Sequence, residues 1–109
     1  MAYDHNLVQR IIEILQGTPA LDEKKMFGGV GYLIHGNMAC GVHGNGLIVR
    51  VGPEAHAEAM TRPHTRPFDL TGRPMSGWLM VEAAGIQDPA VLAEWIQLGV
   101  SYAQSLPPK

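Results

Sequence analysis

The strongest constraint on the fold is a series of short apolar runs in the first half of the chain, separated by glycine and asparagine. The runs cover residues 30–35, 38–43 and 47–51. Gly36-Asn37 and Gly44-Asn45-Gly46 lie between them, and both residue types tolerate the positive φ angles that tight hairpin turns require. Consecutive strands joined by so few residues must run antiparallel. The pattern therefore predicts a β-meander.

Helices are expected at both ends of the chain. Apolar residues recur at helical spacing between positions 7 and 15, and Asp4 or Asn6 can cap the start of this helix. The dipeptide Asp88-Pro89 is typical of a second helix start, and the helical periodicity continues to about Ser105. A short helix is also expected over residues 53–60, because Pro53 suits a first helical turn and several alanines follow it.

Two further strands complete the expected secondary structure. They are residues 25–27, before the meander, and residues 78–81, before the final helix. Residues 20–25 are expected to form a polar connection, and residues 61–67 an irregular loop with two prolines. The order of elements predicts the α+β class. We expect an antiparallel β-sheet meander of about five strands, with the N- and C-terminal helices packed on it.

Length and composition narrow the class of protein. A chain of 109 residues with 46% hydrophobic side chains can bury one core without disulfides or metal, so a single domain over residues 1–109 is expected. The net charge of -2 argues against a protein that coats nucleic acid. Residues 27–49 lack charge, but glycine, histidine and asparagine interrupt them, so no membrane span is expected. A single cysteine, Cys40, and an N-terminus without a signal-peptide pattern predict a cytoplasmic location.

The small net charge conceals a basic centre. Residues 24–73 carry six lysines and arginines against three carboxylates, whereas both ends of the chain are acidic. A small anion or nucleic acid could therefore dock on the arginines of this segment. The candidate anion-binding residues are Arg50, Arg62, Arg66 and Arg73. The alternative is a solvated loop with local ion pairs, such as Arg73 with Asp69.

No combination of residues predicts catalysis or a metal site. Cys40 and His43 have the spacing C-x-x-H, but positions of opposite parity on a strand face opposite sides of a sheet. We therefore expect neither a metal ion nor a cofactor. His64, Asp69 and Ser76 supply the residue types of a hydrolase triad, yet no nucleophile motif surrounds Ser76. The protein is expected not to be an enzyme.

Two other features have both a structural and a functional interpretation. The glycine-rich residues 27–31 lack the Lys-Ser/Thr pair of a P-loop and the glycine spacing of a dinucleotide site. A bulge or tight turn between two strands is therefore expected there. Met26, Met75, Trp78 and Met80 belong either to the core or to an adaptable apolar surface.

Several motifs resemble the TfoX N-terminal domain family, which is named after competence regulators. The segment K-M-F-G-G-V-G-Y at residues 25–32 resembles the opening signature of the family. The segment T-G-R-P-M-S-G-W at residues 71–78 resembles its stand-alone bacterial members. Further similar segments are residues 36–42, 47–52 and 66–69, and the final helix with Leu92, Trp95 and Ala103. The resemblance covers about residues 22–103.

The resemblance implies an α+β domain that acts as a non-enzymatic regulatory or protein-interaction module, with no catalytic residues to transfer. A chain of 109 residues is expected to lack the C-terminal domain that full-length competence regulators add. A protein partner or self-association, such as a homodimer, is expected because the exposed edges of a short meander offer strand pairing. The alternative function is binding of a small anion or of nucleic acid through the arginine cluster.

Overall fold

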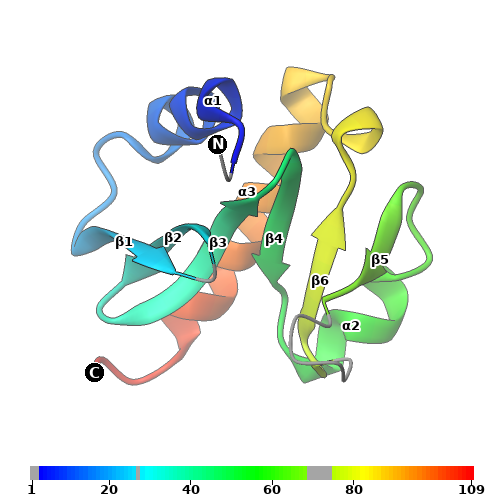
Figure 1. Cartoon of the computed structure of the whole chain (residues 1–109). Helices are drawn as coiled ribbons and strands as arrows, with labels where there is room; N and C mark the ends of the chain where they lie inside the picture. Colours follow the sequence, from blue (N-terminus) through cyan, green and yellow to red (C-terminus); the bar gives the residue numbers. More distant parts are fainter. Residues whose placement is uncertain (1–2, 27, 69–74) are drawn as a thin grey trace.

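The centre of the protein is a six-stranded antiparallel sheet with the strand order β1-β2-β3-β4-β6-β5 (Figure 1). The computed structural model describes residues 3–26, 28–68 and 75–109. The strands are β1 (Leu21–Met26), β2 (Gly29–Ile34), β3 (Asn37–His43), β4 (Gly46–Arg50), β5 (Thr65–Pro67) and β6 (Trp78–Val81). The expected α+β class and the antiparallel meander are confirmed, and the sheet contains one strand more than expected.

The turn between β2 and β3 shows why the meander forms. Ile34 pairs with Asn37, so the two turn residues are His35 and Gly36, with φ angles of 51° and 82°. Positive φ at both positions is the requirement of the hairpin turn whose twist matches that of the strands. The turn therefore lies one residue earlier than expected, and Asn37 begins β3 instead. Gly28, with φ of 74°, lies in the expected turn between β1 and β2.

The two edge strands differ from the sequence-based expectation. β1 begins at Leu21, within the segment expected to be a polar connection, and its first five residues are exposed. β5 lies within the segment expected to be an irregular loop. An edge strand needs backbone hydrogen bonds to one neighbour only, so it forms without burying alternate side chains. Pro67 is tolerated in β5 because an edge strand has one unpaired side.

In the described residues, three α-helices and one short 3-10 helix accompany the sheet. They are α1 (His5–Leu15), α2 (Pro53–Ala59), η1 (Ala83–Gly85) and α3 (Pro89–Ser105). The Asp4 carboxylate caps α1 by accepting hydrogen bonds of 2.9 Å and 3.3 Å from the backbone of Asn6 and Leu7. The Asp88 carboxylate caps α3 in the same way, at 2.9 Å from the Ala90 nitrogen. None of the described helices is long and apolar enough to cross a bilayer.

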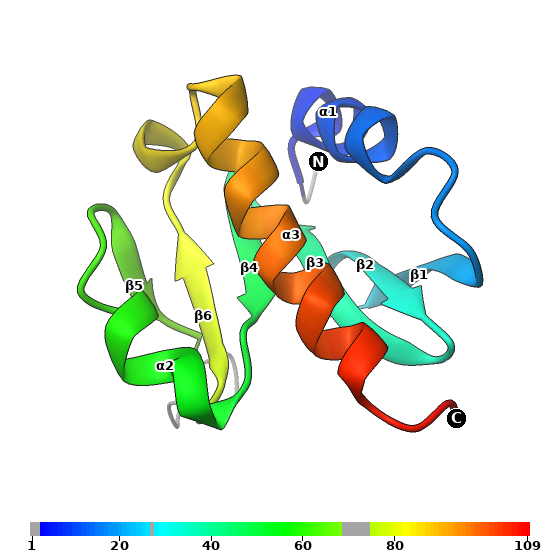
Figure 2. The same cartoon turned by 180° about the vertical axis from the view of Figure 1, so that it is seen from behind.

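The sheet separates two apolar clusters of unequal size. Figure 2 shows α3 crossing one face of the sheet, and the larger cluster lies between the helices and that face. We call the opposite side the helix-free face; its buried cluster consists of Leu33, Met38, Ile48, Phe68 and Met80. Met26, Met75 and Trp78 are half-buried at its margin, so these residues are neither fully core nor fully surface.

Methionines lie directly on glycines across the helix-free face. A Cβ atom at Gly31 would lie 3.0 Å from the Met26 sulfur and 3.3 Å from the Met38 methyl carbon. A Cβ atom at Gly46 would lie 3.0 Å from the Met80 methyl carbon. Glycine therefore provides the space that the flexible thioether side chains fill.

Candidate functional site

Arg50 lies at the end of β4, where its backbone pairs with Trp78 of β6. Its guanidinium carbon is 5.1 Å from the centre of a Trp78 ring and 5.3 Å from the Tyr102 ring. Both distances are within the range of a cation–π interaction. The cation of Arg50 is thus held between two aromatic side chains.

Arg66 lies on the edge strand β5 and pairs with Met80 of β6. Its Nη2 donates a weak hydrogen bond of 3.9 Å to the Met80 sulfur. β4 and β5 are the two neighbours of β6, and the paired residues Trp78 and Met80 both belong to the apolar cluster of the helix-free face. By register Arg50 and Arg66 belong to the same face of the sheet, on either side of β6, but the guanidinium of Arg50 also contacts Tyr102 of α3 and therefore lies at the end of the sheet.

Arg62 is separate from this pair. It follows α2, and its Nη2 is 3.5 Å from the Glu58 carboxylate one helical turn earlier. Its guanidinium carbon lies 5.0 Å from a ring centre of Trp95 in α3, which places it on the helix-covered side. Arg73 and Asp69, and with them the expected local ion pair, lie outside the described residues. The expected arginine cluster is therefore divided between two places.

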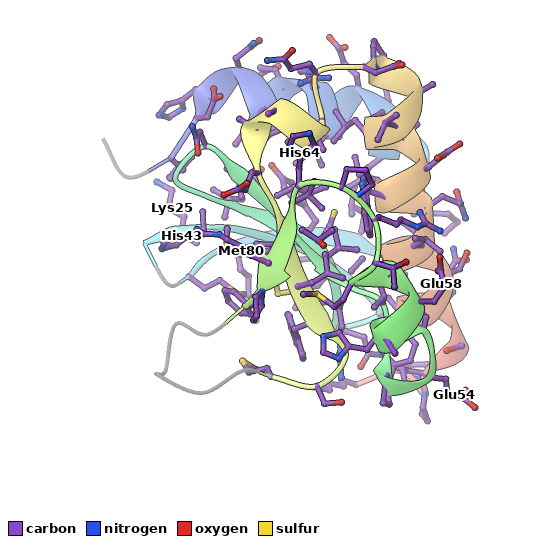
Figure 3. The ribbon with its side chains drawn as sticks, turned by 90° about the vertical axis from the view of Figure 1, so that its right-hand side faces the viewer. Lys25, His43, Glu54, Glu58, His64 and Met80 are labelled. Atoms are coloured by element: carbon purple, nitrogen blue, oxygen red, sulfur yellow. The ribbon has the colours of Figure 1, made fainter. Side chains whose placement is uncertain are left out.

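On the helix-free face, methionine and tryptophan side chains lie near arginines. Figure 3 shows His43 and Met80 on the side of the sheet away from α3. Met75 and Trp78 are half-exposed there, the guanidinium of Arg50 lies over the Trp78 ring, and Arg66 contacts Met80. Methionine, tryptophan and arginine are enriched in protein interfaces relative to other surfaces. This face is the first candidate site.

The second candidate site is a pocket of about 500 Å³ on the opposite side of the fold. Its walls are residues 62–64, residues 84–85 and the side of α3 that carries Asp88, Val91, Glu94 and Trp95. Of these residues, the sequence pointed only to Arg62 and His64 as functional candidates, and Asp88 was expected to begin the final helix. The other walls come from segments that are distant in the sequence, so no local motif marks them.

His64 lines this pocket and has a constrained position next to η1 (Figure 3). Its φ angle is 65°, a value that is uncommon for a residue with a side chain. Its carbonyl oxygen accepts a hydrogen bond of 2.8 Å from the Glu82 nitrogen. A Cβ atom at Gly85 would lie 2.7 Å from the Cβ of His64, so glycine is required for this close approach.

The residues considered for catalysis or metal binding are dispersed. Cys40 is fully buried in β3, and burial raises the pKa of its thiol to about 12, far from the value of a reactive cysteine. Within the described ranges, no group of three or more His, Cys, Asp or Glu side chains could hold a metal ion. Ser76 lies in the turn before β6 and is not part of the pocket that contains His64. Asp69 lies outside the described residues.

Tyr32 and Cys40 are paired polar residues inside the main core. Tyr32 is 2% exposed, and its hydroxyl makes no hydrogen bond to any part of the chain that the structure describes. Burial, followed by the Glu23 carboxylate on the adjacent strand, raises the pKa of this hydroxyl above its ordinary value. Both groups are therefore neutral at physiological pH.

Comparison with known proteins identifies the family. A family model described as the TfoX N-terminal domain matches residues 13–103, from the last part of α1 to near the end of α3. No curated protein and no solved structure gave a significant match. The matched region includes every strand of the sheet and both candidate sites. The chain belongs to the TfoX N-terminal domain family.

Proposed function

We propose that the protein is a non-enzymatic regulatory or interaction module that binds a protein partner through the helix-free face. The observation that carries this proposal is the half-exposed pair Met75 and Trp78 beside the buried Met80, with Arg50 and Arg66 in the strands on either side of β6. Large apolar side chains that remain half-exposed beside arginine are the usual anchors of protein interfaces. Membership of the TfoX N-terminal domain family supports a regulatory module, and we propose a cytoplasmic location for it.

The charge of the helix-free face favours one kind of partner. Arg50 ends β4 and Arg66 is the middle residue of β5, the two strands beside β6, and neither forms an ion pair with any of the described side chains. Opposite charges steer association and fix the register of a complex. We therefore propose a protein segment that carries an apolar anchor flanked by carboxylates. The flexible methionines suit such an anchor because they adapt to its shape.

A photo-crosslinking experiment tests this function. A benzophenone amino acid is placed at position 43 on the helix-free face, or at position 104 on the exposed side of α3, in cells that naturally make the protein. The proposal expects a discrete protein adduct from position 43 and none from position 104. Arg66→Ala should weaken the adduct, whereas Lys109→Ala, which removes the same charge elsewhere, should not. Equal adducts at both positions, or no effect of Arg66→Ala, would overturn the proposal.

The identity of the crosslinked partner separates two versions of this function. Mass spectrometry of the adduct distinguishes another protein from a second copy of the chain. If the adduct is a second copy, light scattering of the purified protein should show a dimer that Arg66→Ala dissociates. A monomer at all concentrations would exclude self-association through this face.

The second candidate function is binding of a small anion or of nucleic acid. It is favoured by the common placement of Arg50 and Arg66 on one face. Such binding should weaken steeply with salt because phosphate contacts release counterions. Fluorescence anisotropy with a labelled DNA duplex, at 50 mM and 200 mM salt and with Arg66→Ala, measures this dependence. Binding that responds neither to salt nor to the substitution would exclude it.

A further inference from the structure

The outer edge of β1 is free to pair with another strand. β1 is the last strand on one side of the sheet, and Figure 1 shows no helix or strand beyond it. It pairs with β2 at all six of its positions without a bulge, so its backbone is regular along its whole length. An exposed edge strand of this kind presents unpaired N–H and C=O groups that another chain can bind. The opposite edge is less suitable, because β5 has only three residues and ends at a proline.

The hydrogen bonds around β1 show which of its residues direct their backbone toward this edge. The His35 nitrogen donates a hydrogen bond of 3.1 Å to the Ala20 carbonyl oxygen, just before the strand begins. Residues of an antiparallel ladder alternate between hydrogen-bonded and non-hydrogen-bonded pairs. The backbone groups that point outward therefore belong to Leu21, Glu23 and Lys25. In agreement, the Glu23 nitrogen donates to the Asp22 carboxylate, at 2.9 Å.

The charged side chains of β1 are self-complementary. All four are exposed, and none has an opposite charge within 4.0 Å among the described residues. Successive side chains of a strand point to opposite faces. Asp22 and Lys24 therefore share the helix-free face with Met26, and Glu23 and Lys25 share the other face. On each face a carboxylate is followed two residues later by a lysine, so a reversed copy of the strand offers lysines to carboxylates.

We propose that two copies of the protein pair through β1, in an antiparallel register centred on Glu23. This register uses every outward-pointing residue, because Glu23 opposes itself and Leu21 opposes Lys25 of the second copy. It also places Asp22 of each copy opposite Lys24 of the other, at the non-hydrogen-bonded positions where opposed side chains approach most closely. The opposed Glu23 carboxylates lie diagonal to the two Lys25 ammonium groups, which reduces their repulsion.

The symmetry of this pair has a consequence for binding. The two-fold axis is perpendicular to the sheet, so two sheets join into one and their helix-free faces point the same way. The dimer thus presents two copies of the face that we propose for partner binding, and a bivalent partner gains affinity by contacting both. Formation of the dimer itself does not depend on that proposed function.

Charge exchange tests the opposed pairs by sedimentation velocity. The wild-type chain should show a dimer that grows with concentration. Lys24→Asp and Asp22→Lys each place like charges opposite one another in both pairs, so each should raise the dissociation constant of the dimer by roughly tenfold or more. An equimolar mixture of the two variants should dimerise again, because every carboxylate then faces a lysine. A wild type that is monomeric at all concentrations, or a mixture as weak as the separate variants, would overturn the proposal.

Single cysteines test the register independently of charge. Under mild oxidation, Glu23→Cys should form a disulfide-linked dimer, because opposed residues of two strands lie within reach of a disulfide. Lys25→Cys should form little, since it opposes Leu21, and the native Cys40 is fully buried and does not compete. Equal or faster linkage through position 25 would refute this register.

One further variant separates this dimer from the proposed function. Arg66→Ala lies on β5, at the opposite edge of the sheet, and should leave both the sedimentation and the disulfide linkage unchanged. Loss of the dimer in Arg66→Ala would assign self-association to the helix-free face instead of β1. Absence of a dimer would leave partner binding by that face untouched.

Discussion

Gly99 of α3 lies directly against the main chain of Ala39 in β3. A Cβ atom at Gly99 would lie 3.0 Å from the Ala39 carbonyl carbon and closer still to its oxygen. Ala39 is the extra residue of an irregularity in the sheet, because Tyr32 pairs with Cys40 whereas Leu33 pairs with Met38. The helix therefore reaches the sheet backbone at the place where β3 bulges.

Gly99→Ala is expected to destabilise the protein. Alanine favours a helix by about 1 kcal/mol over glycine. The added methyl group must nevertheless displace α3 from a backbone that cannot move aside, and overpacking of this kind costs roughly 1–3 kcal/mol. Urea denaturation should show a lower free energy of unfolding for Gly99→Ala and little change for Ser101→Ala, at an exposed position of the same helix. A Gly99→Ala protein as stable as the wild type would contradict the close contact.

Asn37→Ala should weaken the attachment of the C-terminal tail to the sheet, which the Lys109 nitrogen also makes by donating a 2.8 Å hydrogen bond to the His35 carbonyl oxygen. Asn37 is 2% exposed, and its Nδ2 donates a hydrogen bond of 2.9 Å to the Pro107 carbonyl oxygen. Loss of this bond is expected to cost about 1–2 kcal/mol. The same substitution should cost less in a chain that ends at Leu106, because the acceptor is then absent. Equal costs in the two backgrounds would show that the hydrogen bond contributes nothing.

Tyr32→Phe should leave the free energy of unfolding unchanged or raise it by up to about 1 kcal/mol. The substitution removes a buried hydroxyl that lacks a hydrogen-bond partner among the described residues and keeps the ring in the core. Tyr32→Ala should instead lose roughly 3–5 kcal/mol, as other large core truncations do. Thermal and urea unfolding measure both effects. A marked loss of stability in Tyr32→Phe would reveal a hydrogen bond that forms in solution.

Alkaline pH should destabilise the protein through Cys40. Its thiol has an ordinary pKa of 9.0, which burial raises to about 12 in the folded state. Between these values the unfolded chain loses a proton that the folded chain retains, so stability falls with rising pH, by at most about 1.4 kcal/mol per pH unit. Below pH 9 the contribution is fully present. Urea unfolding of the wild type and of Cys40→Ala should be measured from pH 7 to pH 11. Above pH 9, the free energy of unfolding of the wild type should fall relative to that of Cys40→Ala. A difference independent of pH would contradict the raised pKa.

The parts of the fold that the sequence predicts are those with a local physical signal. The strands of the meander bury apolar side chains and end in glycine turns, and α1 and α3 begin at capping aspartates. β1 and most of β5 carry no such signal, because an edge strand is held by its neighbour and leaves its side chains in water. Their positions depend on β2 and β6, so sequence periodicity cannot locate them.

The candidate sites were less predictable than the fold. Arg62 and Arg66 are four residues apart in sequence, yet one contacts Trp95 of α3 and the other contacts Met80 of β6. The pocket joins a loop, a 3-10 turn and one side of α3, and its charge balance depends on how close these segments lie. Proximity between distant segments is a property of the packed chain and leaves no pattern in any one stretch of residues.

The chemistry of the two outer strands also limits how copies of this protein can assemble. β1 presents four consecutive charged residues, from Asp22 to Lys25, and β5 has only three residues and ends at Pro67, which has no N–H group to donate. Two copies of β1 in an antiparallel pair can place Asp22 of each copy opposite Lys24 of the other, whereas a strand added at β5 would find too few hydrogen-bonding groups. Strand-upon-strand assembly can therefore close into a pair through β1, but open-ended growth through both edges is disfavoured.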